Sequence, residues 1–476
     1  MRQTPVRLRQ LRSTYRADSG DDGGRDGIVK LSAIEAPDYL LEAAGRRGIE
    51  QAEVLVETAR RTRVEVSGGR VEELGHAYEV GIALRILRDG ATGFSFTASM
   101  ESAALEGLLE RSDAAARAAT PDEYAGLCEA MPAPESPSIW DPGLARLKVG
   151  AKLAIAKTEE KACLSADPRI KSVIFSRYED AVTTTRIVNS RGLDQAYPGT
   201  VCRLIVFCTA AGRTKGSMGE GAAEERTFRA LRGRQVGREA AKRAAIAADG
   251  IPPETDEVTL VFKPWAALSF LYAVISALSG EAVQLGQSMF VGRQGQVVAS
   301  SLVNLIDDGR LAGRPGSSPV DGEGVPRQTT PLITDGVLRA YYHDLRSARR
   351  AGVPSTGNSG RPGYRSPPRQ APSNAYLGGG TTPPGRLISS VDYGIEVVSF
   401  TDTGGVSGIT GDFSIAASGR RIRHGQLSES LDPFTICGNL RDLLARITGV
   451  GTDLTWFGNL GSPTVRVEGL KVVGGK

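Results

Sequence analysis

The chain has 476 residues and a net charge of +4, with 58 basic against 54 acidic side chains. Its length predicts roughly two to four domains, and its hydrophobic fraction of 40% is typical of a globular protein. The near balance of charge argues against a nucleic-acid-binding protein. The five cysteines form no C-x-x-C pair, which argues against a disulfide framework or a zinc knuckle and favours a cytoplasmic protein.

The first half of the chain alternates between strand and helix patterns. Residues 1–30 are polar and rich in Gly and Asp, and we expect a disordered basic tail there. Gly68 and Gly69, between two alternating runs, predict a tight hairpin turn. In chain order the pattern predicts a helix in residues 31–47, strands at 52–57, 63–66, 80–87 and 92–96, helices at 100–118 and 143–164, strands at 172–177 and 184–189 that pair with each other, strands at 199–210 and 213–219, and a helix at 234–248.

A Gly/Pro stop at residues 249–253 predicts a domain boundary. We expect an N-terminal α/β domain with an antiparallel sheet in residues 31–250 and a C-terminal strand-rich, barrel-like domain in residues 251–476. The second domain opens with a strand at 257–262 and a buried helix at 265–278. That helix is too short and too interrupted by polar residues to span a membrane. The predicted fold class is α+β.

Common catalytic motifs do not occur in the sequence. The three histidines, His76, His343 and His424, are far apart, so a histidine zinc site is not predicted. There is no phosphate-binding glycine loop, and no serine in a nucleophile elbow. Two acidic turns, at residues 307–309 and 321–324, could supply oxygen ligands to a divalent cation, although two solvated glycine turns explain them as well.

The segment from residue 355 to 376 combines glycine with guanidinium, amide and phenol groups. These groups suit the binding of an extended peptide backbone or a carboxylate. An ordinary surface loop rich in Pro and Gly would have the same composition. The candidate substrate-binding residues are Thr356, Asn358, Arg361, Tyr364, Arg369, Asn374 and Tyr376.

Several short motifs follow one another along the chain. They are the Asn-Ser-Arg-Gly turn at 189–192, the two acidic turns, Ser-Thr-Gly-Asn at 355–358 and Ile-Thr-Gly-Asp-Phe-Ser at 409–414. In this order they resemble the TldD/PmbA family, also called modulators of DNA gyrase, and especially its TldE (PmbA) branch. The resemblance runs from about position 48 to the C-terminus, and it implies the fold of that family. The stretch 361–376 is closer to TldD-type chains, which leaves the branch open and is compatible with a specialised member, for example one that matures a small peptide-derived product.

In this family, TldD-type subunits bind zinc through a His-Glu-x-x-x-His helix and a distal Cys, with the Glu as general base. The resemblance places that helix at residues 265–278, where the key positions are Leu271, Tyr272 and Ser276. No Cys stands in residues 456–462. Since Leu and Ser cannot replace imidazole and Tyr cannot replace the carboxylate base, we expect no metal, no cofactor and no catalytic residue in this chain. Zinc is expected in a TldD-type partner.

The resemblance therefore implies a non-catalytic subunit of a cytoplasmic TldD/TldE heterodimer that hydrolyses amide bonds of unfolded or small peptides. The candidate residues between 356 and 376 would line its substrate chamber. Two alternatives stay open. One is a metal-free homodimer that binds peptides as a regulatory protein, and the other is an enzyme with a diverged site that uses His343 with Asp344, or Cys437. The apolar pattern around Cys437 predicts a buried thiol.

Overall fold

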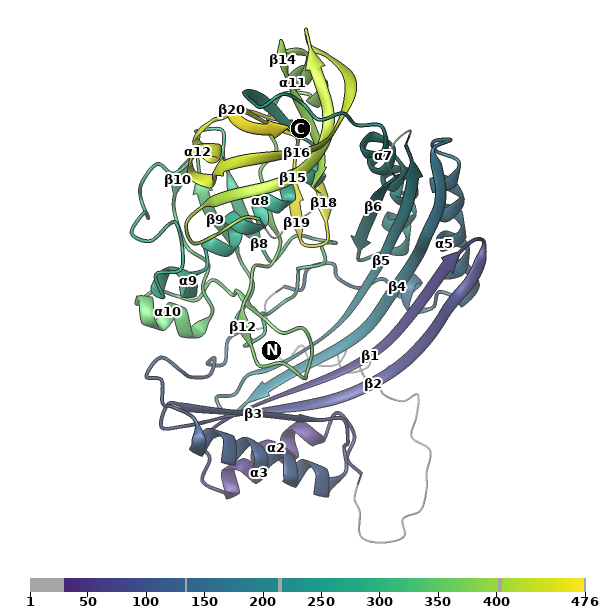
Figure 1. The fold of residues 1–476 in the computed structure, drawn as a ribbon. Coiled ribbons are helices and arrows are strands. Elements are labelled where there is room, and N and C mark those ends of the chain that lie inside the picture. Colours follow the sequence, from purple (N-terminus) through teal and green to yellow (C-terminus); the bar gives the residue numbers. More distant parts are fainter. Residues whose placement is uncertain (1–29, 133–134, 213–215, 401–404, 475–476) are drawn as a thin grey trace.

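The computed structural model describes residues 30–132, 135–212, 216–400 and 405–474, so almost all of the predicted tail at 1–30 lies outside the described residues. A long, curved sheet forms the first half of the chain, and the second half is seated over its concave side (Figure 1). In the described part of the chain, no helix is both long enough and apolar enough to cross a membrane. The predicted division at residue 250 stays a prediction.

The curved sheet is antiparallel throughout and has the strand order β3-β2-β1-β4-β5-β6. The predicted hairpin turn is confirmed, because Ser67 pairs with Arg70 and both intervening glycines have positive φ. The strands are β1 (Gln51–Ser67), β2 (Arg70–Arg88), β3 (Ala91–Thr97), β4 (Ile170–Asn189), β5 (Asp194–Ala211) and β6 (Gly216–Glu225).

Four of the predicted strands form only two strands in the structure. The prediction that residues 172–177 and 184–189 pair with each other is therefore wrong. Both segments lie in β4, just as residues 52–57 and 63–66 both lie in β1. β1 and β4 pair without interruption along this length. The middle of β1 is polar on both faces: Glu57 lines a cavity on the concave side, and Thr62 accepts a hydrogen bond from Lys152 on the other side (2.8 Å). The apolar alternation that signals a strand therefore fades there.

Helices cover the convex face of the sheet (Figure 1). Gly219 and Gly221 on β6 allow one of them, α7, to approach the sheet closely. Cys202 and Cys208 lie in the core beneath α5 and α7. The predicted helix at 143–164 is divided into two. The helices are α2 (Ala36–Arg46), α3 (Ser102–Ala118), α4 (Pro142–Ala145), α5 (Val149–Leu164), α6 (Phe228–Arg232) and α7 (Val236–Ala248).

In the second half of the chain, five strands close into a barrel. The pairing runs β16-β15-β14-β7-β20, and β20 pairs back to β16. α8 (Pro264–Ala277) fills the barrel end with aromatic packing, such as Phe270 against Phe262 and Phe413. The α+β class and the barrel-like C-terminal half are thus confirmed. The barrel strands are β7 (Asp256–Phe262), β14 (Tyr393–Phe400), β15 (Asp412–Arg423), β16 (Gln426–Asn439) and β20 (Val465–Gly474), with β17 (Ile447–Val450) beside β20.

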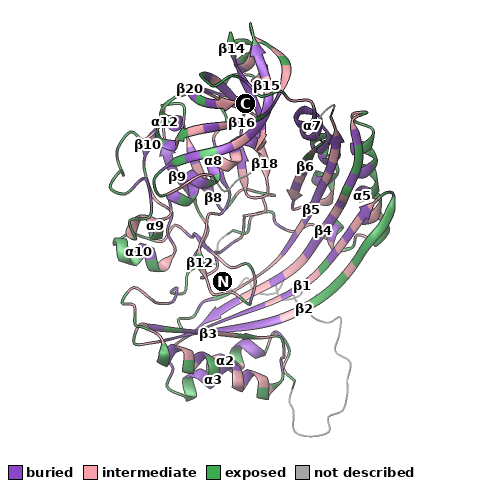
Figure 2. Ribbon diagram, viewed as in Figure 1, coloured by how far each residue is buried: buried purple, intermediate pink, exposed green. Residues whose placement is uncertain are grey.

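Beside the barrel, a second sheet of short strands has the order β10-β9-β8-β13-β19-β18. Its loops extend toward the concave face of the curved sheet, and burial is high where the two meet (Figure 2). The remaining elements are β8 (Leu305–Asp308), β9 (Thr329–Thr334), β10 (Val337–Leu338), β11 (Ser359–Gly360), β12 (Arg369–Gln370), β13 (Ala375–Leu377), β18 (Thr455–Phe457), β19 (Leu460–Ser462), α9 (Gly280–Gln284), α10 (Leu345–Ala351), α11 (Pro384–Ser389) and α12 (Leu440–Ala445).

The close approach of α7 to β6 gives a test of the fold. A Cβ added at Gly219 would lie 2.2 Å from the carbonyl oxygen of Ala240, a helix backbone atom that cannot move aside. We expect Gly219→Ala to lower the free energy of unfolding by about 1–3 kcal/mol, as overpacking does. Gly150→Ala, on the exposed side of α5 with nothing within 4 Å, is the control and should stay within about 0.5 kcal/mol. Urea denaturation of both variants measures the difference, and equal stability would contradict this packing.

Candidate functional site

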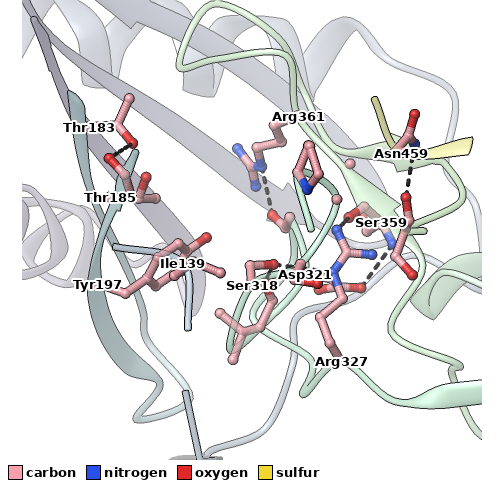
Figure 3. A pocket seen from close by; sticks show the side chains of 18 of the residues that line it. Ile139, Thr183, Thr185, Tyr197, Ser318, Asp321, Arg327, Ser359, Arg361 and Asn459 are labelled. Carbon is pink, nitrogen blue, oxygen red and sulfur yellow. Dashed lines mark hydrogen bonds between the residues drawn. The ribbon is translucent and has the colours of Figure 1, made fainter. Parts of the chain in front are cut away.

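A cavity of about 400 Å³ lies between the concave face of the curved sheet and the loops of the second half (Figure 3). β1, β4 and β5 supply one wall, and segments around residues 315–327, 359–361 and 372–373 supply the other. Polar side chains reach the cavity from both walls. They include Glu57, Thr183, Thr185, Tyr197, Glu224, Arg226, Asp321, Arg327, Arg361 and Asn459.

A buried group of four charged side chains joins the two walls, and we call it the junction network: Glu53, Arg85, Glu323 and Arg361. Arg85 on β2 donates to Glu53 on β1 from Nε and Nη2, at 3.2 and 2.8 Å. Its Nη1 lies 3.1 Å from Glu323 of the loop, and Arg361 donates to Glu53 from the other side. All four side chains are buried. Two acids therefore balance two bases where the loops meet the sheet.

Burial changes the pKa of Glu323. Desolvation raises its pKa to about 7, opposed by the neighbouring Arg85 charge. One carboxylate oxygen also accepts the backbone N–H of Leu345 at 3.0 Å. The side chain therefore fixes the start of α10 as well as the sheet, and its contacts are structural.

The two asparagines among the candidate residues hold loops together. Asn358 donates from Nδ2 to the Asp307 carboxylate at 2.6 Å. Asn374 donates to the Asp308 carbonyl oxygen at 2.6 Å and accepts the N–H of Gly316 at 2.9 Å. Both amides are fully buried. They position the walls of the cavity, and their polar atoms are engaged within the protein.

Tyr364 and Arg361 attach the same segment to the curved sheet. The Tyr364 ring is buried against Gly81 of β2, where an added Cβ would lie 2.2 Å from the ring, and it meets Phe96 edge-on at 6.0 Å. Arg361 donates from Nε to the Gly322 carbonyl oxygen at 2.6 Å, besides its bond to Glu53, and it lines the cavity. The segment from 359 to 377 is thus an ordered bridge between the two halves.

The other three candidate residues differ in exposure. Thr356 is half-buried; its hydroxyl accepts the backbone N–H of His343 at 2.6 Å and donates to the Asn358 amide oxygen at 2.7 Å. Arg369 on β12 is exposed. Tyr376 on β13 is half-buried, with its ring 5.1 Å from that of Trp456. Arg369, Tyr376 and Thr356 therefore have surface left for a ligand, and Arg361 lines the cavity. The substrate-binding role of all seven stays a prediction.

The explanation of the two acidic turns as solvated glycine turns is wrong. Asp307, Asp308, Asp321 and Glu323 are all buried. The Asp307 carboxylate accepts three bonds, from the Asn358 amide and from the backbone and hydroxyl of Ser373, and burial still raises its pKa. Within the described ranges, no group of three or more His, Cys, Asp or Glu side chains is arranged to hold a metal ion.

The alternative site at His343 has the three residue types of a hydrolase triad in the wrong order. Ser347 lies between the other two: its hydroxyl donates to Asp344 at 2.7 Å and meets Nδ1 of His343 at 3.1 Å. A triad needs the imidazole in the middle to accept the serine proton. Burial also lowers the pKa of His343. Cys437, predicted to be buried, is instead half-buried and faces Ser414 across the strand pair.

The α8 positions that correspond to the zinc ligands of the resemblance do not suit a metal. Leu271 packs in the barrel core, whereas Tyr272 and Ser276 are on the exposed side of the helix, with Tyr272 63% exposed. An aliphatic chain, a phenol and a hydroxyl do not form a zinc donor set. The residues present therefore do not fit zinc.

Three polar residues that line the cavity were not among the candidates from the sequence. Arg226 follows β6, Arg327 precedes β9, and Tyr197 lies on β5, more than a hundred residues apart at the extremes. They belong to no local motif and come together only through the fold. The family motif at 321–324 was the nearest signal, because it forms part of the same wall.

Family models match three consecutive parts of the chain. They describe the PmbA/TldA metallopeptidase domain 1 over residues 52–119, the central domain over 142–248 and the C-terminal domain over 255–474. The chain belongs to the PmbA/TldD metallopeptidase family. The resemblance inferred from the ordered motifs is thereby confirmed.

Relatives of the PmbA type match this PmbA/TldD family member over most of its length. The metalloprotease PmbA homolog of Haemophilus influenzae is 24% identical over 446 residues, which cover 92% of this chain and 96% of that protein. The metalloprotease TldD homolog of Buchnera aphidicola subsp. Acyrthosiphon pisum is 35% identical, but over only 192 residues. That match spans 40% of this chain and 39% of the relative.

Solved structures share the whole fold. A protein from Thermotoga maritima, described as a modulator of a DNA gyrase, has a TM-score of 0.84 at 25% identity and covers 92% of this chain and 100% of its own. TldE from Thermococcus kodakarensis has a TM-score of 0.83 at 22% identity with the same coverage, and it supports the fold alone.

The junction network predicts a large effect of a small change. Glu53→Gln keeps the shape of the side chain but leaves Arg85 and Arg361 without their shared carboxylate. We expect a loss of about 3–5 kcal/mol in the free energy of unfolding, since breaking a buried ion pair strands an uncompensated charge. Glu42→Gln, on the exposed side of α2 opposite Arg46, is the matched control and should cost less than about 0.5 kcal/mol. Thermal and urea unfolding measure both, and a wild-type-like Glu53→Gln would refute this role.

Proposed function

We propose that this chain is the non-catalytic, TldE-like subunit of a heterodimeric zinc metallopeptidase of the TldD/TldE type. The TldD-type partner supplies the zinc and hydrolyses amide bonds of unfolded or small peptides, in peptide or natural-product maturation. This chain forms part of the wall of the substrate chamber. The observation that carries the proposal is the chemistry of α8, where Leu271, Tyr272 and Ser276 stand in the positions of two imidazoles and a general base.

The rest of the chain retains the architecture that a chamber wall requires. The bridge from 359 to 377 is held by buried amides and by the junction network, so it presents a fixed surface. Arg361 reaches the cavity, whereas Arg369 and Tyr376 have exposed surface nearby in the chain. We propose that these three contact a substrate, while Asn358, Tyr364 and Asn374 hold the wall in place.

The N-terminal half of β2 is a candidate surface for the partner. β3 pairs with β2 only from Ile82 to Arg88, and among the described residues no strand pairs with that edge over residues 70–77. Val71 and Leu74 there are 44% and 58% exposed. An open strand edge with apolar side chains favours pairing with another chain.

The thiols support a cytoplasmic location. All five cysteines are free, and four of them are buried. Proteins of oxidising compartments commonly use such residues in disulfides, whereas reducing compartments keep them as thiols. We therefore propose that the heterodimer works in the cytoplasm.

Metal content and assembly test the proposal together. Native mass spectrometry of the chain alone should show a species without stoichiometric zinc, and the pure chain should cleave no peptide. Co-expression with a TldD-type chain from the same source should give a heterodimer that carries zinc and hydrolyses peptides. A partner variant without its zinc-binding histidine controls for the origin of the metal. Zinc bound with activity in the lone chain, or a homodimer that ignores the partner, would overturn the proposal.

The open edge of β2 predicts where assembly fails. Leu74→Lys places a charge on the exposed edge and should reduce co-purification with the TldD-type chain at least tenfold, because an ammonium group opposes burial in an interface. Leu164→Lys, at the exposed end of α5, introduces the same charge away from that edge and should leave assembly unchanged. Pull-down yields normalised to expression measure the effect, and equal yields for the two variants would place the interface elsewhere.

A further inference from the structure

Two arginines that line the cavity bind no carboxylate within the described residues. Arg226 donates to four backbone carbonyl oxygens: that of Arg314 at 3.1 Å, that of Thr200 at 3.0 Å, that of Ser317 at 2.8 Å, and that of Pro315. These carbonyl contacts fix the guanidinium group but do not neutralise its charge.

Arg327 is held in the same way from the opposite wall. It donates to the carbonyl oxygens of Gly357 and Ser359, at 2.7 and 3.3 Å, and to the Ser318 hydroxyl at 3.2 Å. A guanidinium group has five N–H donors in a planar fork that matches a carboxylate. With three of them used, Arg327 retains two, and Arg226, with four used, retains one. Donors without acceptors therefore remain on both walls of the cavity.

The acids that line the cavity act on these arginines without a direct contact: the Arg327 charge acts to lower the pKa of Asp321 and the Arg226 charge that of Glu224, but no ion pair or hydrogen bond joins them among the described residues. The Asp321 carboxylate is already bonded by the backbone N–H groups of Glu323, Val325 and Ser359. Burial raises the pKa of both Glu57 and Glu224, so each carboxylate lies in surroundings that disfavour its negative charge. Burial also disfavours the charge of Arg226, but it lowers the pKa of that side chain only to about 10, so the guanidinium group stays charged at neutral pH.

Tyr197 lies within the fields of both arginines. Burial raises the pKa of its hydroxyl, and the charges of Arg327 and Arg226 each act to lower it. No hydrogen bond of that hydroxyl is found with the part of the chain that the structure describes. Tyr197, Arg226 and Arg327 line the same cavity, and a phenol donor together with guanidinium groups is a combination that stabilises a bound oxyanion.

The remaining lining suits a ligand larger than a simple anion. The volume of about 400 Å³ lies within the range of small-molecule sites. Leu55, Ile139, Ile187 and Val320 give apolar surface, and Thr183 and Thr185 add hydroxyl groups beside it. A short peptide would match this lining, because it carries apolar side chains next to a polar backbone.

We propose that this cavity binds a short peptide by its C-terminal carboxylate, which Arg226 and Arg327 receive together with the Tyr197 hydroxyl. The choice of a peptide as the carrier of the carboxylate rests on the proposed function, since amide hydrolysis produces new C-terminal carboxylates. The site itself lies within this chain and needs neither the partner nor zinc.

Calorimetric titration of the full chain, without a partner, tests the site. An apolar tripeptide is compared as the free acid and as the C-terminal amide, with succinate as a small free carboxylate. The acid should bind about tenfold or more tightly than the amide, because hydrogen bonds to a charged group are lost in the amide. Equal affinity of acid and amide, or no binding of either, would overturn the proposal. Tighter binding of succinate than of the tripeptide acid would also overturn it, in favour of a free carboxylate ligand.

Two variants locate the binding. Arg327→Gln should abolish the preference for the acid, whereas Arg310→Gln, an exposed arginine in the same half with no place in the cavity, should retain it. Tyr197→Phe keeps the aromatic ring and serves as the test if Arg327→Gln does not fold. It should weaken binding of the acid severalfold but leave binding of the amide unchanged. Retention of the full preference in both cavity variants would overturn the site. A failure here leaves zinc content and assembly with the partner untouched, so the two proposals fail separately.

Discussion

The arrangement of the whole molecule depends on the junction network. Glu53 lies on the central strand of the curved sheet and is shared by Arg85, its neighbour on β2, and by Arg361, which comes from a loop some three hundred residues later. The four ionisable side chains are moved out of water together, which is tolerable only because each has a partner of the opposite kind within the group. The loop wall therefore has one position on the sheet, because a shift of a few ångströms would leave a charge buried alone.

The cavity follows from that constraint. Once Arg361 and Glu323 hold the loops at β1 and β2, the remaining concave face toward β4 and β5 is left uncovered, and the space between becomes the cavity. Asn358 and Asn374 then fix the loop wall from behind through Asp307 and the Asp308 carbonyl. Most of the candidate residues from the sequence thus hold the loops in place. Most of the side chains that line the cavity come from other parts of the chain.

Sequence reasoning reached the fold class, the hairpin at Gly68 and Gly69, the barrel-like second half and the family, because these rest on local patterns or on ordered motifs. It failed where the role of a residue depends on partners that are distant in the sequence. The middle of β1 is polar on both faces because Lys152 lies on one side and a cavity on the other, so alternation could not reveal one long strand. Asp307 and Glu323 read as solvated acids, since nothing local predicts Asn358 or Arg85 as their partners. Arg226 and Arg327 gave no signal, as their importance depends on which walls the fold brings together.

Charged side chains are distributed unevenly between α8 and the cavity. At α8 the side chains are ordinary: Leu271 packs in the core, and Tyr272 and Ser276 meet solvent. At the cavity, by contrast, the half-buried guanidinium groups of Arg226 and Arg327 are held by carbonyl oxygens and the Ser318 hydroxyl instead of by carboxylates, and partial burial of a charge without an ion pair costs free energy. A wall that served shape alone could be built from apolar and hydroxyl side chains at lower cost. The proposed recognition of a carboxylate therefore rests on these arginines at the junction between sheet and loops, and not on the side chains of α8.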